Sequence, residues 1–270
     1  MSIAALAMYD WPEVQWANDA LWAFIAARLG EAGIAAPSAL DRSRSYSAPW
    51  LDSALLLAQT CGYPYATELR GKVQLVGTPC YRAPGCQRAD YSSALIASRA
   101  SGIGSPGEMG NACAAINSLE SQSGHWALRA ALAATPGAVP PARAVFTGGH
   151  RESLRAVAAG LADVAAIDAV CWALAARHEA EAVAAVRVFG WSPPAPGLPL
   201  ITALATPEPT LAALRRALRE CISEPSLLLS RDALMLENFA ERPEADYDRI
   251  LGLKRAALGL AFPALEYRVQ

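Results

Sequence analysis

Short apolar runs alternate with helical patterns through the middle of the chain. Each run is bounded by polar residues, which is typical of strands buried in a parallel sheet, and apolar residues at helical spacing follow each one. The predicted strands are 112–117, 142–146 and 164–167, and the predicted helices are 126–133, 151–159 and 170–176. Strands and helices in this order predict an α/β fold built from βαβ units with right-handed crossovers.

The two ends of the chain carry further apolar patterns. They predict strands at 3–8, 72–76, 91–97, 186–189 and 200–204, and helices from about 14 or 18 to 29, at 50–59 and at 209–222. The stretch 77–86 is rich in turn residues, and the prolines of 191–199 predict a stiff, extended connector. We expect the strand at 91–97 to cross into a second unit and the residues after 222 to be largely helical.

The polar stretch 120–125 lies between a predicted strand and a predicted helix. The first N–H groups of a helix have no partner within the helix, and the helix dipole leaves partial positive charge there. Ser121 and Ser123 add hydroxyl groups, and Gly124 lets a ligand approach the main chain. The pattern predicts an anion-binding helix start, and a serine that only caps the helix explains it equally well.

Two more polar clusters follow the next predicted strands. Thr147-Gly-Gly-His150 comes after one strand and Asp168 after the other. Carboxyl ends of parallel strands meet at one edge of a sheet, where ligands bind in open α/β folds. We therefore expect Ser121–Gly124, His150 and Asp168 to converge on one cleft.

The first part of the chain offers aromatic residues at an equivalent place. Tyr9, Asp10 and Trp11 follow the first predicted strand, and Tyr46 and Tyr81 lie in predicted loops. Together with the polar clusters they suggest two α/β lobes that close on a small polar ligand.

Each candidate also has a purely structural interpretation. His150 can stand at a helix start with its ring in solvent, Asp168 can cap the helix that follows it, and Tyr9 and Trp11 can belong to the core. Arg129 is expected to point to solvent or to a neighbouring carboxylate.

Composition narrows the class of protein and of partner. Hydrophobic residues make up 53% of the 270 residues and charged residues 18%, as in globular proteins. A net charge of -2 gives no electrostatic reason to expect nucleic acid or an anionic membrane as partner. The most apolar window, 156–176, contains Asp163 and Asp168, so we predict no membrane-spanning helix.

The sequence shows neither a targeting segment nor a cofactor-binding motif. The start has no basic region before its apolar residues, so we expect a cytoplasmic protein as the sequence stands, and a periplasmic one if a leader precedes it. Cys80 and Cys86 flank a turn with no second pair or histidine cluster, which disfavours zinc. We expect neither a metal nor a cofactor.

Taken together, these residues resemble the phosphate/phosphonate-binding-protein-like family, the ABC transporter substrate-binding proteins of type II periplasmic-binding-protein fold. The motifs that carry the resemblance are Met8-Tyr9-Asp10, Gly77-Thr-Pro-Cys-Tyr81 with Cys86 and Tyr91, Ser121-Gln-Ser-Gly124, Thr147-Gly-Gly-His150, Ala162 to Asp168 and Pro196-Gly-Leu-Pro199. They occur in family order between residue 8 and about residue 205.

The resemblance implies two lobes, each a mostly parallel sheet flanked by helices, joined by two crossover strands. One lobe would comprise 1–92 and 192–270, and the other, with the anion-binding helix start, 93–191. The resemblance further implies a ligand clamp whose members are Tyr9, Tyr81, Ser121, Gln122, Ser123, Gly124, His150 and Asp168. In it the helix start and His150 hold a phosphoryl or similar anion, Asp168 faces the far end of the ligand, and the two tyrosines close over it.

Two classes of function fit this arrangement. The first is a solute-binding protein or sensor for a small anionic or zwitterionic ligand, with an ABC permease as a further partner. The hydroxyl groups of Ser-Gln-Ser-Gly are sparse for a phosphate site, which leaves a carboxylate or heterocycle open. The second is an enzyme on the same scaffold, resembling pyrimidine synthases or dehydratases, with His150 and Asp168 as acid and base.

Overall fold

The computed structural model describes residues 2–268, which form two compact units. One unit consists of Met1–Arg82, Gln87–Ala89 and Pro196–Asp248, and the other of Ala83–Cys86, Asp90–Ala195 and Arg249–Gln270. The final segment from Arg249 therefore groups with the second unit, whereas the sequence analysis assigned it to the first. Three short strands lie where the chain passes from one unit to the other: β4 (Cys86–Gln87), β5 (Asp90–Tyr91) and β11 (Ala195–Pro196).

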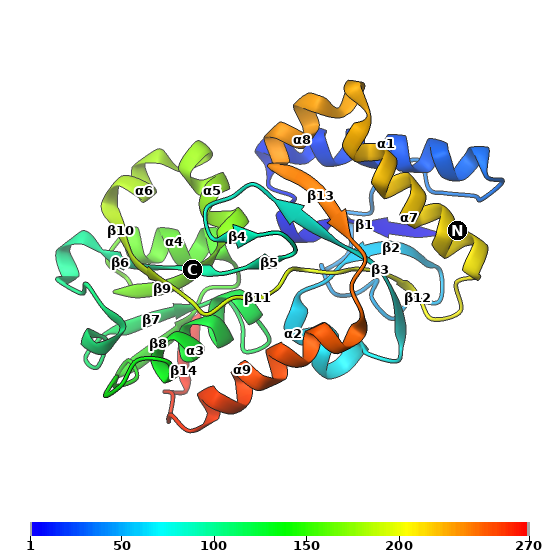
Figure 1. The fold of residues 1–270 in the computed structure, drawn as a ribbon. Coiled ribbons are helices and arrows are strands. Elements are labelled where there is room, and N and C mark those ends of the chain that lie inside the picture. The colour runs from blue at the N-terminus through cyan, green and yellow to red at the C-terminus, as the bar shows by residue number, and fades with distance from the viewer. Residues whose placement is uncertain (1, 269–270) are drawn as a thin grey trace. The chain divides into compact units, whose positions relative to one another are not determined.

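The first unit is built on a five-stranded sheet (Figure 1). Its order is β1 (Ile3–Ala5), β2 (Leu55–Gln59), β12 (Leu200–Ala203), β3 (Val73–Tyr81) and β13 (Leu236–Ala240). β1 and β2 are parallel, but β12 runs antiparallel to both its neighbours and β13 antiparallel to β3. The sheet is therefore mixed, not mostly parallel as predicted.

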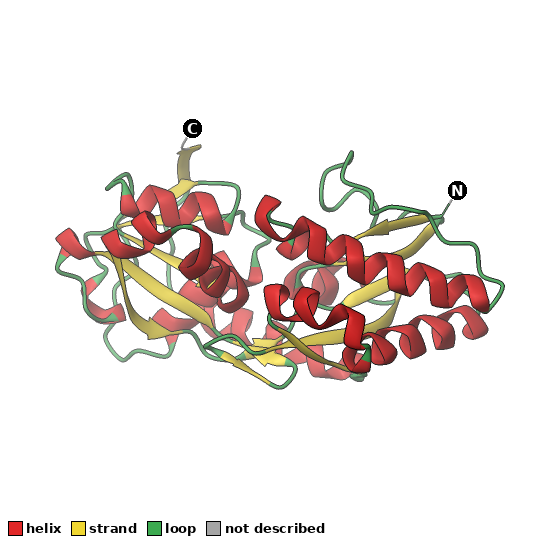
Figure 2. Cartoon of the chain, turned by 90° about the horizontal axis from the view of Figure 1, so that it is seen from above, coloured by secondary structure: helices red, strands yellow, loops and turns green. Residues whose placement is uncertain are grey.

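Three helices pack together over this sheet, and the two long ones are prominent in Figure 2. They are α1 (Gln15–Glu31), α7 (Glu208–Ser223) and α8 (Leu228–Leu234), and the short helix α2 (Gly62–Pro64) follows β2. The apolar residues at helical spacing that predicted α1, among them Leu21, Trp22 and Ile25, are buried.

The helix predicted at 50–59 is wrong, because its second half is the strand β2. All five residues of β2 are buried, and the strand pairs with β1 on one side and β12 on the other. A strand covered on both faces is apolar at successive positions, so in a short window its pattern cannot be told from that of a buried helix. β13 falls in the tail predicted to be helical, and β3 runs on through the stretch predicted as turns.

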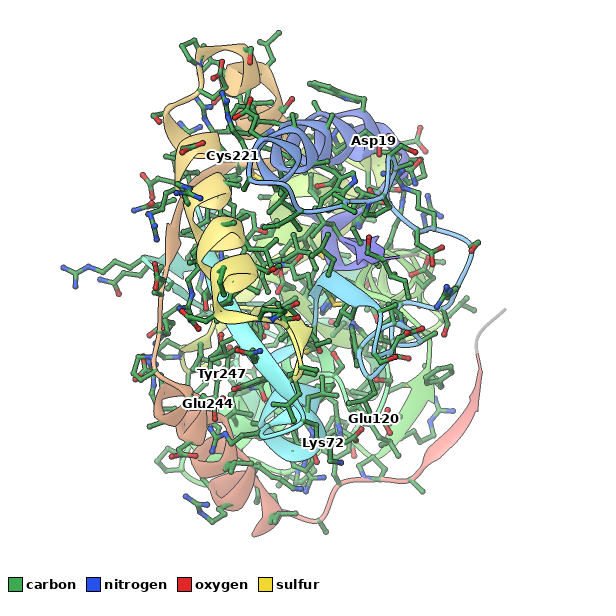
Figure 3. All side chains as sticks on the ribbon, turned by 90° about the vertical axis from the view of Figure 1, so that its right-hand side faces the viewer. Asp19, Lys72, Glu120, Cys221, Glu244 and Tyr247 are labelled. Carbon is green, nitrogen blue, oxygen red and sulfur yellow. The ribbon has the colours of Figure 1, made fainter. Side chains whose placement is uncertain are left out.

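The motif Pro196-Gly-Leu-Pro199 packs against the rest of the first unit through its glycine. A Cβ atom on Gly197 would lie 2.9 Å from the carbonyl oxygen of Ala89 and 3.1 Å from Cγ2 of Thr78. The hydroxyl of the buried Tyr247, labelled in Figure 3, donates to the carbonyl of Gly197 at 3.0 Å and lies 2.9 Å from Oγ1 of Thr78. Close packing of the backbone explains the glycine.

The second unit is built on a six-stranded sheet. Its order is β10 (Val186–Trp191), β6 (Ser93–Ser98), β9 (Val164–Asp168), β7 (Cys113–Ile116), β8 (Arg143–Phe146) and β14 (Leu265–Arg268). The strands from β9 to β14 are parallel, as the βαβ pattern predicted, and β6 is antiparallel to both of its neighbours.

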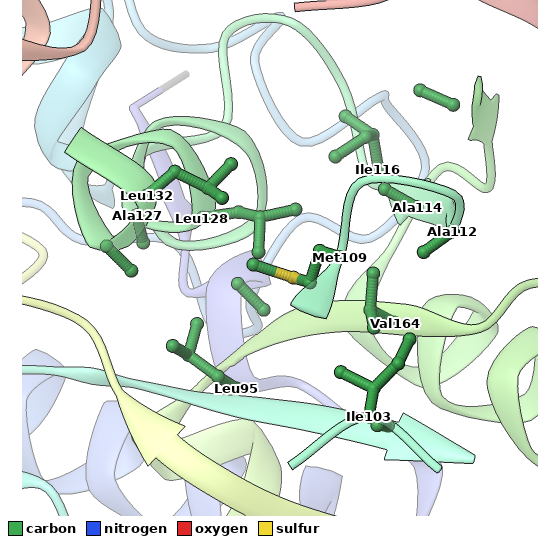
Figure 4. Close-up of a cluster of buried hydrophobic side chains, with 14 of the residues drawn as sticks. Leu95, Ile103, Met109, Ala112, Ala114, Ile116, Ala127, Leu128, Leu132 and Val164 are labelled. Atoms are coloured by element: carbon green, nitrogen blue, oxygen red, sulfur yellow. The ribbon is translucent and has the colours of Figure 1, made fainter. Parts of the chain in front are cut away.

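Helices cover both faces of this sheet (Figure 1). α3 (Ala127–Ala133) lies on one face, and α4 (His150–Ala158), α5 (Ala169–His178) and α6 (Ala180–Ala185) pack with one another on the other. Under α3, Leu128 and Met109 point toward each other in the core cluster of Figure 4, and both are fully buried. Alanines of β7, β8 and β9 belong to the same cluster and let the helix lie close to the sheet.

Arg129 attaches the carboxyl-terminal segment to the second unit. α9 (Asp248–Leu258) leads into this segment. One guanidinium nitrogen of Arg129 donates to the carbonyls of Ala257 at 3.2 Å and Leu260 at 3.1 Å, and the group lies over the rings of Trp126 and Phe262. The expectation that Arg129 points to solvent or to a carboxylate is therefore wrong.

No helix among residues 2–268 is long and apolar enough to cross a membrane.

Candidate functional site

The predicted helix start exists, and it begins with a wide, π-helical turn. The chain leaves β7 at Ile116, and residues Gln122–Trp126 form this turn before α3 begins. The side chain of Ser121 caps it, because its Oγ accepts the N–H of Gly124 at 2.9 Å. Gln122 and Ser123 are only 1% and 4% exposed. Ser121 is thus a cap, as the structural interpretation predicted.

Gly124 is required by a close approach to Asn117. A Cβ atom on this glycine would lie 2.6 Å from Cγ and Oδ1 of Asn117, which is closer than real Cβ contacts. Asn117 in turn accepts a hydrogen bond from the hydroxyl of Ser153 at 3.0 Å, and that hydroxyl lies 2.6 Å from Oγ1 of Thr147. The sequence analysis did not identify Asn117 or Ser153, since the link depends on how β7, β8 and α4 are packed. The glycine fixes the turn onto this network.

Ser123 and His150 are brought together by the fold. Ser123 lies in the π-helical turn, His150 is the first residue of α4, and Oγ of the serine is 2.7 Å from Nε2 of the histidine. On the other side of the ring, the backbone N–H of Asp168 donates to Nδ1 at 3.3 Å. The three successive strand ends predicted to converge therefore meet at this imidazole ring.

The protonation of His150 follows from its surroundings. Burial lowers its pKa from 6.5 to about 3, and a hydrogen bond with the backbone of Ala166 opposes that lowering only partly. Desolvation disfavours the charged form of a histidine. The ring is therefore neutral at physiological pH, and it does not stand in solvent as one interpretation had it.

The carboxylate of Asp168 caps the next helix. Asp168 is 1% exposed, and its Oδ1 accepts the N–H groups of Val170 at 2.8 Å and Cys171 at 3.2 Å at the start of α5. This is the capping role that the structural interpretation predicted. The buried carboxylate also contributes to raising the pKa of the Cys171 thiol, for which burial is the main cause.

Tyr9 and Tyr81 belong to the first unit. Their rings contact each other edge to face at 5.2 Å, and the amide of Gln59 donates to the hydroxyl of Tyr81 at 3.5 Å. All three line a cavity of about 40 Å³ under α1 and α7 whose other walls are mainly aliphatic. Asp10, next to Tyr9, forms an ion pair with Arg42 at 2.5 Å.

Within the part of the chain that is described, no group of three or more His, Cys, Asp or Glu side chains could hold a metal ion.

Comparisons with known proteins place these features in context. The sequence matches the family model described as ABC transporter, phosphonate, periplasmic substrate-binding protein over residues 55–247, well over half of the chain. A search of curated proteins finds no match.

Solved structures resemble the whole chain. PhnD1 of Prochlorococcus marinus in complex with methylphosphonate is 13% identical, with a TM-score of 0.74 and 94% of this chain and 97% of that one covered. A binding protein component of a Pseudomonas aeruginosa ABC phosphonate transporter is 16% identical, with a TM-score of 0.71 and coverage of 96% and 86%. A Xanthomonas citri protein bound to ATP is 15% identical, with a TM-score of 0.70 and coverage of 96% and 97%. These likenesses show the fold, a type II periplasmic-binding-protein fold with two mixed sheets flanked by helices.

Proposed function

Because the chain belongs to the family of periplasmic phosphonate-binding proteins of ABC transporters and is a solute-binding protein of that family, we propose that its ligand is a small phosphonate or phosphate. The proposed seat is the start of the π-helical turn in the second unit, with Ser121, Gln122, Ser123 and Gly124. His150 supports it from α4.

The hydrogen bond between Ser123 and His150 carries this proposal. We assign the ring proton of the neutral imidazole to Nε2, because the backbone N–H of Asp168 points at Nδ1 from 3.3 Å; on this assignment Nε2 donates to Oγ of Ser123, 2.7 Å away. The hydroxyl hydrogen of Ser123 is then directed away from the ring. A hydroxyl whose own hydrogen is free to donate suits an oxyanion acceptor.

The helix start adds a favourable field. The N–H of Gly124 is already donated to Oγ of Ser121, but the aligned peptide dipoles still give partial positive charge at this end. The neutral ring of His150 contributes orientation and no charge. The seat therefore binds an anion through dipoles and hydroxyl groups, and we expect its affinity to depend only weakly on salt.

The same contacts argue against the enzyme interpretation. A general base is most effective when its pKa lies near the working pH, whereas the pKa of His150 is lowered to about 3. The other candidate, Asp168, uses its Oδ1 to cap α5. The arrangement favours holding a ligand over moving a proton.

Isothermal titration calorimetry tests the proposal. We expect methylphosphonate or inorganic phosphate to bind the wild-type protein and to be recovered unchanged. Ser123→Ala should weaken binding by about ten-fold or more, because a hydrogen bond to a charged group contributes about 1.5–3 kcal/mol. Ser223→Ala is the matched control, since that exposed hydroxyl only donates to the carbonyl of Glu220 in α7.

Equal affinities of Ser123→Ala and wild type would place the seat elsewhere. ATP belongs in the same titration as a larger phosphate ligand.

Two predictions remain: that an ABC permease is a partner, and where in the cell the protein is located. Co-purification would test the first, and fractionation of the native cells the second.

A further inference from the structure

One buried hydroxyl of the second unit lacks a hydrogen-bond partner among residues 2–268. Ser93 is 1% exposed, and its Oγ has no partner among the described residues. Its backbone, in contrast, is fully engaged: Oγ of Ser192 accepts its N–H at 2.9 Å, and its carbonyl accepts the N–H of Ser192 at 2.9 Å. Buried hydroxyl groups normally have a partner, so an orphaned one needs an explanation.

The register of the sheet places this hydroxyl next to Asp168. Ser93 is the first residue of β6 and lies directly opposite Asp168, the last residue of β9, in an antiparallel pair. The backbone groups of Ser93 face Ser192, on the β10 side, and the N–H of Asp168 faces His150. The two residues therefore form a non-hydrogen-bonded pair, in which opposed side chains are closest.

The face of the sheet is also determined. Side chains alternate along a strand, so Ser93 shares a face with Leu95 and Ala97, which pack in one cluster with Leu128 of α3. The hydroxyl is thus on the face that α3 covers, at the edge where β9 ends. The π-helical turn that leads into α3 packs against β9. At the same edge, the backbone N–H of Asp168 contacts the ring of His150.

We propose that Ser93 is a ligand-binding residue of the anion seat and that its hydroxyl donates to an oxygen of the bound anion. The inference rests on the proposed function and extends it, because it supplies the additional hydroxyl that Ser-Gln-Ser-Gly lacks. Donors from β6 and from the π-helical turn approach the ligand from two separate elements. This arrangement suits the tetrahedral oxyanion of a phosphonate or phosphate better than a planar carboxylate.

The test measures both ligand affinity and stability. A ligand-binding hydroxyl affects affinity, whereas a structural hydroxyl affects the stability of the free protein. The variants are Ser93→Ala and the nearly isosteric Ser93→Cys. Ser98→Ala is the control on the same strand, where the hydroxyl accepts the N–H of Ala100 at 3.3 Å. Affinity for methylphosphonate, phosphate and acetate is measured by calorimetry, and stability without ligand by urea unfolding.

We expect both Ser93 variants to bind methylphosphonate and phosphate about ten-fold or more weakly. Their unfolding midpoints should equal or exceed that of the wild type, since the free protein loses no hydrogen bond. Ser98→Ala should bind like the wild type.

Four results would overturn the inference. Unchanged affinity of the Ser93 variants, with Ser123→Ala impaired, leaves the proposed function standing and removes Ser93 from the site. A lower unfolding midpoint of both variants with unchanged affinity assigns the hydroxyl a structural partner. A wild-type protein that binds acetate but neither phosphorus oxyanion contradicts the tetrahedral ligand, and one that binds none of the three contradicts the proposed function as well.

Discussion

The neutral state of His150 predicts how the stability of the protein depends on pH. The pKa of this ring is about 3 in the folded chain, against 6.5 as its ordinary value. Between these two values the unfolded chain binds a proton that the folded chain does not bind. The free energy of unfolding contributed by His150 is therefore complete above pH 6.5 and is lost as the pH falls toward 3.

The slope gives the magnitude. Each pH unit inside this window costs about 1.4 kcal/mol for a single group, so a change from pH 6.5 to pH 5 should cost up to about 2 kcal/mol. His150 is only partly buried, and exchange with solvent reduces this figure. Carboxylates that titrate in the same range add their own slope, so the contribution of His150 has to be isolated by a variant.

Urea unfolding at a series of pH values between 7 and 4.5 makes the measurement. His150→Gln keeps a polar side chain without a titrating ring, and His178→Gln is the control because His178 is exposed at the end of α5. The wild type and His178→Gln should lose stability more steeply on acidification than His150→Gln. Parallel curves for all three proteins would refute the neutral state of the His150 ring.

Two further predictions concern the packing around the seat. Gly124→Ala should lower the free energy of unfolding by about 1–3 kcal/mol through overpacking, as measured by urea unfolding. Gly30→Ala, where an added Cβ meets nothing within 4 Å, should be neutral or stabilising; equal effects of the two changes would contradict the close approach. Arg129→Met should release the carboxyl-terminal segment to limited proteolysis and cost about 2 kcal/mol. The control Arg255→Met changes an exposed arginine of α9 and should leave cleavage unchanged, and equal cleavage of both variants would show that Arg129 does not hold the segment.

Local patterns in the sequence predicted most of the second unit. The βαβ alternation of 112–176 matches β7, α3, β8, α4, β9 and α5 to within a few residues. Each of these strands is a short apolar run followed directly by a polar turn and a helix, so the signal lies within a window of about a dozen residues. The caps at Ser121 and Asp168 were foreseen as alternatives for the same reason, since a cap binds N–H groups two or three residues away.

The first unit shows where such windows fail. β2 is flanked by β1, about fifty residues earlier in sequence, and by β12 (Leu200–Ala203), which follows it by well over a hundred residues. Its apolar run became a strand because those partners bury both of its faces. β13 is likewise a strand through its pairing with β3. Neither partner is visible within the segment itself.

The sequence by itself determined the α/β class, the helix start at Ser121–Gly124 and the identity of the residues at the strand ends. Only the tertiary structure decided how they act. The distance of 2.7 Å between Ser123 and His150 depends on the order of the strands, and the pairing of Ser93 with Asp168 depends on an antiparallel register. The attachment of the last segment depends on Arg129 contacting carbonyls more than 120 residues away. Hydrogen bonds, burial and pKa are properties of three-dimensional neighbours, whereas propensity and capping act between neighbours in the chain.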